Sequence, residues 1–215
     1  MKKILIIALL MSTVFASRAQ NVDLIGYGGY TFDEKVGASG GYYDYGKIAG
    51  SGMWGVAIDA YVRPDKSIIL DFNSQNTSYI LNPYYAGAPT ISNGKISLSY
   101  LTIGGNQYFG ANPKAKGYVG AAIGACFVSG SYDEQNSHYS TSGTRFAWNF
   151  HLGAKVYASE RIGIRLQAQI HSPVAGAGVG MGFGTGGAGV GVTTYSNVLQ
   201  FNLNGGLIIR VGGKK

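Results

Sequence analysis

Apolar and polar residues alternate along most of this chain. In the segment 162–170 every second residue is Ile, Leu or Ala, and the residues between them are Gly163, Arg165, Gln167 and Gln169. Successive side chains of a β-strand point to opposite faces of the sheet, so this pattern predicts a strand whose two faces meet different surroundings. Outside the first 20 residues no segment carries an apolar stripe of helical period, and the sequence predicts an all-β protein.

The same period predicts eight strands, each about 10–14 residues long, which is enough for the ~9–11 residues that a tilted strand needs to cross a bilayer. Their connections alternate in length. Three are short turns, "PDK", "GANPKAK" and "SER", and the other four are long segments rich in Gly, Ser, Asn and Tyr. This alternation predicts an antiparallel meander with both chain ends on the short-turn side. The predicted strands are 22–32, 52–63, 67–77, 96–109, 117–128, 145–157, 161–171 and 198–211.

Alternation alone does not decide which face is inside, because a soluble barrel would turn its apolar residues inward. The polar faces, however, consist mainly of Gly, Ala, Asn and Gln, whereas a surface in water would carry many Lys and Glu. The apolar faces are bulky and carry Trp54, Phe109, Phe127 and Phe146 where a membrane barrel has its aromatic girdles. The sequence therefore predicts an eight-stranded antiparallel up-and-down transmembrane β-barrel with its apolar faces toward lipid, closed so that no strand edge is left unpaired.

Four segments repeat one cadence of strand and turn: "YLTIGGNQYFG", "KGYVGAAIGACF", "WNFHLGAKVYASERIGIRLQAQI" and "LQFNLNGGLIIRV". In this cadence nearly the whole chain after residue 20 resembles the small outer-membrane β-barrel domain family, the OmpA/OmpX/OmpW-like group. The resemblance implies a barrel in the outer membrane of a Gram-negative bacterium, with lipid and the barrel-assembly machinery as partners. Many members end in Phe, whereas this chain ends in "GGKK". Short turns of such barrels are periplasmic, so we expect periplasmic termini and extracellular long loops.

The first 20 residues, "MKKILIIALLMSTVFASRAQ", have the features of a secretory signal peptide: two lysines, an apolar run and small residues before the expected cleavage site. Cleavage there leaves one barrel domain over 21–215. Loss of three cations lowers the formal charge from +7 to +4, so the basic balance does not indicate nucleic acid binding. Cys126 is the only cysteine, which excludes an internal disulfide and a Cys-based zinc site.

Six charged residues on the polar faces form the main candidate site. Asp59 and Asp71 lie on neighbouring predicted strands, and Lys155 and Arg165 lie on the opposite wall, all in the half of the barrel near the short turns. The predicted network consists of Asp59, Asp71, Lys155, Arg165, Arg63 and Arg210. Charges in a confined lumen need partners, so we predict salt bridges across the lumen. An ion-selective constriction is the alternative.

Two further groups of residues are candidate sites. His151 and His171 also point inward, but they are far apart along the barrel and make a weak metal site. The segment 130–143 gathers side chains that suit nucleophilic catalysis and that any solvated loop also contains: Asp133, Glu134, Ser137, His138 and Ser140. We predict no catalytic residue, metal or cofactor, and keep an enzyme at the barrel rim as a second alternative.

The long connections contain two biased compositions. Every second residue of 176–186 is Gly, and the formal G-x-G-x-x-G of 184–189 lacks the strand and helix that a dinucleotide site needs. We prefer a loop over or into the barrel mouth to an extension of a strand. Tyrosines predicted in the long loops suit an outer aromatic girdle, with a surplus for a ligand-binding rim. They are Tyr42, Tyr43, Tyr45, Tyr79, Tyr84, Tyr85, Tyr132, Tyr139 and Tyr195.

An eight-stranded interior is only wide enough for side chains to fill it. We therefore predict a monomeric, non-enzymatic outer-membrane barrel with a structural or surface-interaction role. A narrow pore, or an OmpW-like conduit for small apolar solutes, is the first alternative. The sequence names no extracellular ligand.

Overall fold

A computed structural model describes residues 21–37, 43–83, 91–112, 114–134, 137–174, 180–184, 187–191 and 198–212. The predicted signal peptide, 1–20, lies outside the described residues. Within the described ranges, no helix is long and apolar enough to span a membrane. The strands are β1 (Val22–Thr31), β2 (Glu34–Gly37), β3 (Tyr43–Ile48), β4 (Ser51–Arg63), β5 (Lys66–Pro83), β6 (Ile91–Phe109), β7 (Ala115–Glu134), β8 (Ser137–Tyr157), β9 (Ile162–Val174), β10 (Gly180–Gly184), β11 (Gly187–Gly191) and β12 (Gln200–Val211).

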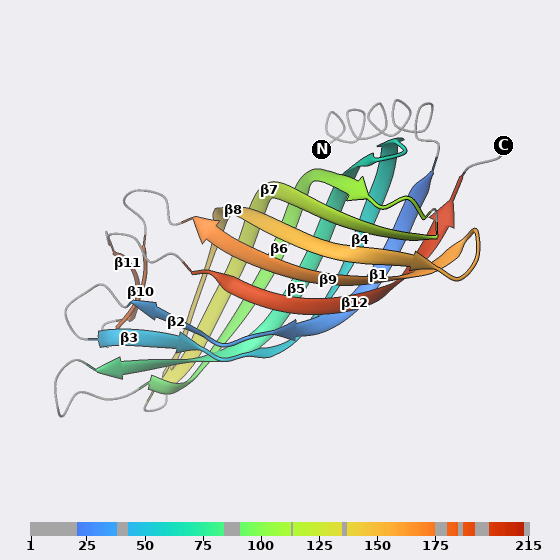
Figure 1. Ribbon diagram of the computed structural model, residues 1–215. Helices are drawn as coiled ribbons and strands as arrows, with labels where there is room; N and C mark the ends of the chain where they lie inside the picture. Colours follow the sequence, from blue (N-terminus) through green and yellow to red (C-terminus); the bar gives the residue numbers. More distant parts are fainter. Residues whose placement is uncertain are drawn as a thin grey trace.

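Eight of the strands close into a barrel (Figure 1). Each pairs antiparallel with its neighbours in the order β1, β4, β5, β6, β7, β8, β9 and β12. β12 then pairs with β1, and Val22 at the start of β1 lies opposite Val211 at the end of β12. Closure satisfies the backbone hydrogen bonds within the ring, as hydrocarbon surroundings require. The predicted fold is confirmed.

The two ends of the barrel differ in how well the strand bounds were predicted. At the short-turn end the observed bounds lie within two residues of the predicted ones. At the other end several strands run further, as where β5 continues to Pro83 and β7 and β8 stay paired up to Glu134 and Ser137. The segment 130–143 is thus largely a hairpin, and its prediction as a loop was wrong. Likewise β2 and β3 extend the hairpin of β1 and β4 beyond the ring.

The assignment of the two faces is confirmed along the barrel wall. On β9, Ile164 and Leu166 are 50% and 61% exposed, whereas Arg165 between them is 1% exposed. On β8, Phe150 and Leu152 are exposed on the outside, and Asn149 is buried inside. Because alternate side chains face opposite ways, the isoleucine face of 162–170 lies outward and the amide face lies in the lumen.

The outer apolar band ends sharply toward the long-loop side. Along β5, Phe72 faces outward and the next two outward positions are Ser74 and Asn76. Ser74 pairs with Ser99 of β6, and their hydroxyls lie 2.9 Å apart. Aromatic side chains with outward positions line this boundary: Trp54, Phe72, Phe127, Phe146 and Phe201. The girdle predicted from Trp54, Phe127 and Phe146 is therefore present at the long-loop boundary. The predicted contribution of the loop tyrosines concerns side chains outside the described residues: Tyr42, Tyr43, Tyr45, Tyr84, Tyr85, Tyr132, Tyr139 and Tyr195.

Inward tyrosines lie against glycines of neighbouring strands, which explains why both residue types are abundant. A Cβ added to Gly55 would lie 2.3 Å from the ring of Tyr27. A Cβ added to Gly153 would lie 2.7 Å from the hydroxyl of Tyr118. Both tyrosines are buried. Each ring fills the space that a neighbouring side chain would otherwise occupy, so larger residues at these glycines would displace the ring.

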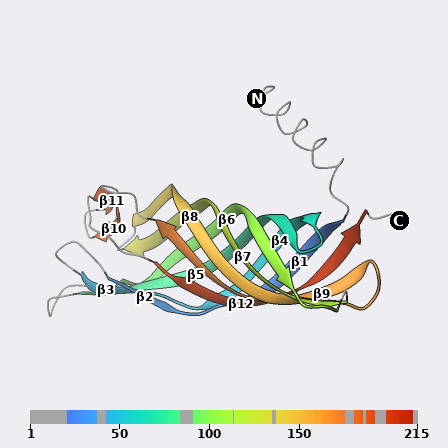
Figure 2. The ribbon, with the colours of Figure 1, turned by 45° about the horizontal axis from the view of Figure 1, so that its top comes forward.

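The Gly-rich segment forms a small hairpin of its own. β10 and β11 pair with each other in a separate two-stranded sheet, with Met181 opposite Val190. Figures 1 and 2 place this hairpin at the long-loop end of the barrel. It is not an extension of a barrel strand, so the less favoured alternative was wrong, and the preferred loop between β9 and β12 contains a short hairpin.

Candidate functional site

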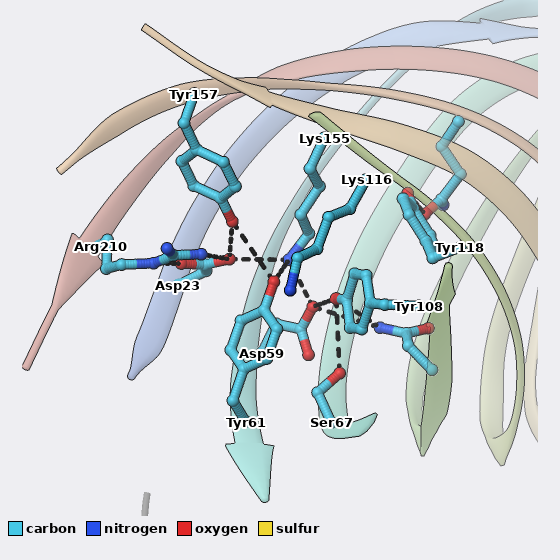
Figure 3. Close-up of polar contacts among 12 residues, drawn as sticks. Asp23, Asp59, Tyr61, Ser67, Tyr108, Lys116, Tyr118, Lys155, Tyr157 and Arg210 are labelled. Carbon is cyan, nitrogen blue, oxygen red and sulfur yellow. Dashed lines mark hydrogen bonds and ion pairs between the residues drawn. The ribbon is translucent and has the colours of Figure 1, made fainter. Parts of the chain in front are cut away.

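Lys155 of β8 lies at the centre of a charged cluster in the short-turn half of the lumen (Figure 3). Its Nζ lies 2.8 Å from Asp23 Oδ2 and 2.6 Å from Asp59 Oδ2. The lysine side chain is 1% exposed and both carboxylates are fully buried. Asp23 and Asp59 are partners on the paired strands β1 and β4. Lys155 therefore crosses the lumen to a pair of acids on the opposite wall.

Asp23, which the predicted network did not include, has three side-chain partners: Lys155, Tyr157 and Arg210. Arg210 Nε lies 2.9 Å from its Oδ1, and the Tyr157 hydroxyl donates to its Oδ2 at 2.5 Å. The sequence interpretation missed Asp23. A signal was present, because Asp23, Ile25 and Tyr27 alternate with Leu24 and Gly26, but the acid stands alone beside the predicted cleavage site.

Tyrosines and amides surround the other acid, Asp59. Tyr108 donates its hydroxyl hydrogen to Asp59 Oδ2, and Asn106 Nδ2 donates to the same oxygen at 3.2 Å. The rings of Tyr61 and Tyr108 have their centroids 5.3 and 5.2 Å from Lys155 Nζ. Aromatic faces attract cations at such distances, so they add to the ion pairs that hold the ammonium group.

The series of side-chain hydrogen bonds continues from Asn106 toward the long-loop end of the lumen. Its Oδ1 lies 2.6 Å from His151 Nε2, and His151 Nδ1 lies 2.9 Å from Asn149 Oδ1. Asn149 Nδ2 then donates to the Thr102 hydroxyl at 3.0 Å. Side chains from β6 and β8 are thereby linked over several layers of the lumen. Both ring nitrogens of His151 therefore contact side-chain amides. Within the described part of the chain, no group of three or more His, Cys, Asp or Glu is placed to hold a metal ion.

Asp71 and Arg165 form a second, looser group. The Tyr27 hydroxyl donates to Asp71 Oδ1 at 2.7 Å, and Asn73 Nδ2 donates to it at 3.0 Å. Arg165 lies over the Tyr27 ring, with its Cζ 4.2 Å from the centroid, and its Nη2 is 3.5 Å from Asn204 Oδ1. Arg165 Nε and Nη1 have no hydrogen-bond partner. Tyr27 thus stands between the acid and the guanidinium, in place of a direct salt bridge.

The buried cations Lys155 and Arg165 lie on the wall opposite Asp23 and Asp59, whereas Arg210 lies beside Asp23 on the neighbouring strand. Lys116, Lys155 and Arg165 are register partners across β7, β8 and β9, whereas Asp23 and Asp59 are partners on β1 and β4. Within the described lumen the aspartates are Asp23, Asp59 and Asp71, the buried cations are Lys155 and Arg165, and the half-buried cations are Lys116, Arg145 and Arg210.

Arg63 does not belong to the network. The register between β4 and β5 shifts between Tyr61 and Arg63, and Arg63 is exposed at the short-turn rim. Strict alternation had placed it on the inner face with Asp59 and Tyr61. The irregularity next to the two-residue turn breaks the alternation, which is why the prediction for Arg63 was wrong.

The lumen changes character toward the long-loop end. The Tyr100 hydroxyl donates to Gln200 Oε1 at 2.8 Å, and its ring centroid lies 4.5 Å from that of His171. Both ring nitrogens of His171 are buried without a partner. Around and above this layer the inward side chains form an apolar cluster: Ile48, Tyr79, Ile96, Leu98, Tyr100, Cys126, Val128 and Ala147. Tyr79 had been predicted in a long loop, but it is buried on the inner face of β5.

The residues weighed for a rim enzyme fall on the hairpin of β7 and β8. Asp133 lies opposite His138, and Glu134 lies opposite Ser137. Their side chains lie outside the described part of the structure, and so do those of Tyr132 and Tyr139. Ser140 is exposed. The backbone register places an acid opposite a histidine, and the rim enzyme stays the second alternative.

No family model matches the chain, and no curated protein matches its sequence. Solved structures do match over most of its length. The outer membrane protein OprG from Pseudomonas aeruginosa has a TM-score of 0.58 at 12% identity, over 91% of this chain and 97% of OprG. Neisserial surface protein A has a TM-score of 0.52 at 12% identity, over 88% and 96%. Ail of Yersinia pestis, bound to the heparin analogue sucrose octasulfate, has a TM-score of 0.50 at 11% identity, over 89% and 97%.

The likeness to these proteins concerns the fold. The chain has the architecture of the small eight-stranded outer-membrane barrels, as its resemblance to the OmpA/OmpX/OmpW-like group implied.

Proposed function

We propose that this protein is a closed outer-membrane barrel with a structural or surface-interaction role and no enzymatic activity. The observation that supports this function best is the filled cross-section around Lys155. The ammonium group bridges Asp23 and Asp59, and the tyrosines around it are buried. An interior closed by paired charges and aromatic rings leaves the outer surface and the rims as the parts that meet other molecules.

The orientation follows from the same proposal. Residues 1–20 act as a cleaved signal, and 21–215 form a monomeric barrel delivered by the assembly machinery and surrounded by outer-membrane lipid. The short turns and both termini then face the periplasm. The long hairpins, including 130–143, face the outside and present the surface for an extracellular ligand. Heat-dependent migration on a detergent gel and recovery with outer membranes test the localisation.

Conductance in planar bilayers tests the closed lumen. The wild-type barrel should show no discrete conductance steps. A variant with Tyr61→Ala, Tyr108→Ala and Tyr157→Ala removes three rings around Lys155 and should conduct. A matched variant, with the outward rings of Trp54, Phe146 and Phe150 replaced by Ala, should stay closed. Steady conductance by the wild type would contradict the proposal, and the gel shift establishes that each variant is folded.

A narrow pore is the second candidate, and one observation favours it. Several buried polar atoms of the lumen have no partner in the protein: Asp59 Oδ1, Gln75 Nε2, Arg165 Nε and Nη1, and both nitrogens of His171. Buried polar groups normally bond to protein or to ordered water, so water in the lumen would satisfy them. If these sites connect into a continuous file of water, the wild-type protein conducts, and the same bilayer measurement decides between the two functions.

A further inference from the structure

The short-turn rim carries exposed cations from all three turns. They are Arg63, Lys66, Lys114 and Arg161, and the exposed acids among them are Asp65 and Glu160. Within the described part of the chain, none of the four cations makes a side-chain hydrogen bond or ion pair. Asp65 is engaged by Gln107, whose Nε2 donates to it at 3.1 Å. Arg63 and Lys66 act on Asp65 by charge attraction at longer range. With four exposed cations to two exposed acids, the rim is a positively charged surface.

Backbone hydrogen bonds hold the turns that carry these cations. Asp65 O accepts from Tyr108 N at 2.8 Å, and Lys114 O accepts from Tyr157 N at 2.8 Å. Arg161 O accepts from Arg210 N at 2.7 Å. Each turn is thus bonded to a barrel strand next to it. The cations project from a defined ring, so a ligand that contacts several of them need not order the turns first.

The apolar band reaches this rim directly. Val62 precedes Arg63 and is 51% exposed, and Ile162 follows Arg161 and is 53% exposed. The opposite boundary is different, because serines such as Ser74 and Ser99 follow the aromatic girdle there. At the short-turn boundary the hydrocarbon-facing side chains are followed by exposed cations, and at the long-loop boundary they are followed by hydroxyl groups.

We propose that the short-turn rim binds the phosphate groups of anionic phospholipids in the adjacent membrane leaflet. The inference rests on the proposed membrane location. Long basic side chains at the edge of an apolar band keep their stems along hydrocarbon and place their charge at the level of the lipid phosphates. The rim would then select anionic over zwitterionic lipid and set the depth of the barrel.

Lipid exchange measured by electron spin resonance tests this binding. The barrel is refolded in phosphatidylcholine bilayers, and the motionally restricted fractions of spin-labelled phosphatidylglycerol and phosphatidylcholine are compared. The wild type should prefer phosphatidylglycerol about fivefold, the factor that one cation engaged at an anionic surface supplies. At 1 M salt, where the Debye length is about 3 Å, the preference should fall toward one.

Matched double variants locate the site. Lys66→Gln with Lys114→Gln removes two charges from the short-turn rim and should lower the preference severalfold. Lys35→Gln with Lys95→Gln removes two exposed charges from the long-loop end and should leave it unchanged. Replacing Arg63, Lys66, Lys114 and Arg161 together by Gln should abolish it.

Two results would overturn the inference. The first is a wild-type preference near one, and the second is an equal loss in the two double variants. Either result, obtained with a normal motionally restricted lipid fraction, leaves the membrane barrel intact. A protein that restricts no lipid at all would instead contradict the proposed membrane function itself.

Discussion

The lumen has two halves that are filled by different interactions. The short-turn half is closed by Lys155, its two aspartates and the hydroxyl groups of tyrosines. The long-loop half is filled by the apolar cluster around Leu98, Cys126 and Val128. Directional interactions among charges fail when one partner is lost, whereas an apolar cluster tolerates changes that keep its volume. The two halves should therefore respond differently to the same kind of substitution.

The largest effect is expected from Lys155→Met. It leaves Asp59 without a cation inside the lumen, and removing one member of a buried ion pair typically costs about 3–5 kcal/mol. The free energy of unfolding in urea, measured on barrels refolded in vesicles, checks this. Lys155→Met combined with Asp59→Asn should recover part of the loss. Equal losses in the single and double variants would show that Lys155 acts through its packing alone.

The outer wall provides a comparison with the lumen at the same height. Ile164→Lys puts a charge on the lipid face, two residues from Ile162 at the rim, and should cost less than the ~2–4 kcal/mol expected at the bilayer midplane but more than about 1 kcal/mol. Gln167→Lys enters the polar lumen and should cost less. Folding yields and urea midpoints in lipid vesicles check the pair. If Gln167→Leu improves folding while Ile164→Gln proves harmless, the assignment of the lipid face is wrong.

The loss of stability on replacing a lumen aspartate by Asn should be larger where the aspartate has more charged partners. Asp23 is bonded to Lys155 and Arg210, so Asp23→Asn should cost about 1.5–3 kcal/mol, the range for hydrogen bonds to charged groups. Asp71 is bonded to Tyr27 and Asn73 and should be less sensitive to Asp71→Asn. Urea midpoints of the two variants, measured side by side, give the order. The reverse order would mean that Arg165 depends on Asp71 more than its geometry indicates.

Substitutions in the apolar half separate volume from polarity. Val128→Thr keeps the shape of the side chain but buries a hydroxyl group among apolar residues. It should lower the free energy of unfolding by about 1–3 kcal/mol. Leu98→Met nearly keeps the volume and should cost less than about 1.5 kcal/mol. Similar urea midpoints for Val128→Thr and the wild type would show that water reaches this half of the lumen.

The smallest effect is expected outside the barrel wall. Lys47 Nζ lies 2.6 Å from Asp33 Oδ2, and this pair is well exposed. The hydrogen bond from Lys47 lowers the pKa of Asp33, so its small stabilisation is present above the ordinary pKa of a carboxyl group and is lost as the pH falls through the lowered value. Asp33→Asn should leave the urea midpoint at pH 7 nearly unchanged. A clear drop would show that the hairpin of β2 and β3 stabilises the barrel.

The sequence by itself determined the strands, their antiparallel order and their two faces. Period-two alternation in segments such as 162–170 is a local property, because each residue faces opposite to the next whatever the rest of the chain does. The segments "PDK" and "SER" also predicted two of the short turns. The strand bounds at the long-loop end were harder to predict. Segments such as 130–143 are rich in Gly, Ser and Tyr, which is typical of loops, although these residues also pair as strands.

Only the tertiary structure decided which charges meet. Lys155 reaches Asp59 across 96 positions of sequence, and that contact depends on the stagger of strands around a closed ring. The same stagger brought Asp23 beside Asp59 and placed Tyr27 between Asp71 and Arg165. A local irregularity turned Arg63 out to the rim. Alternation specifies the face of a strand, but closure of the barrel sets the height at which each side chain finds its partner.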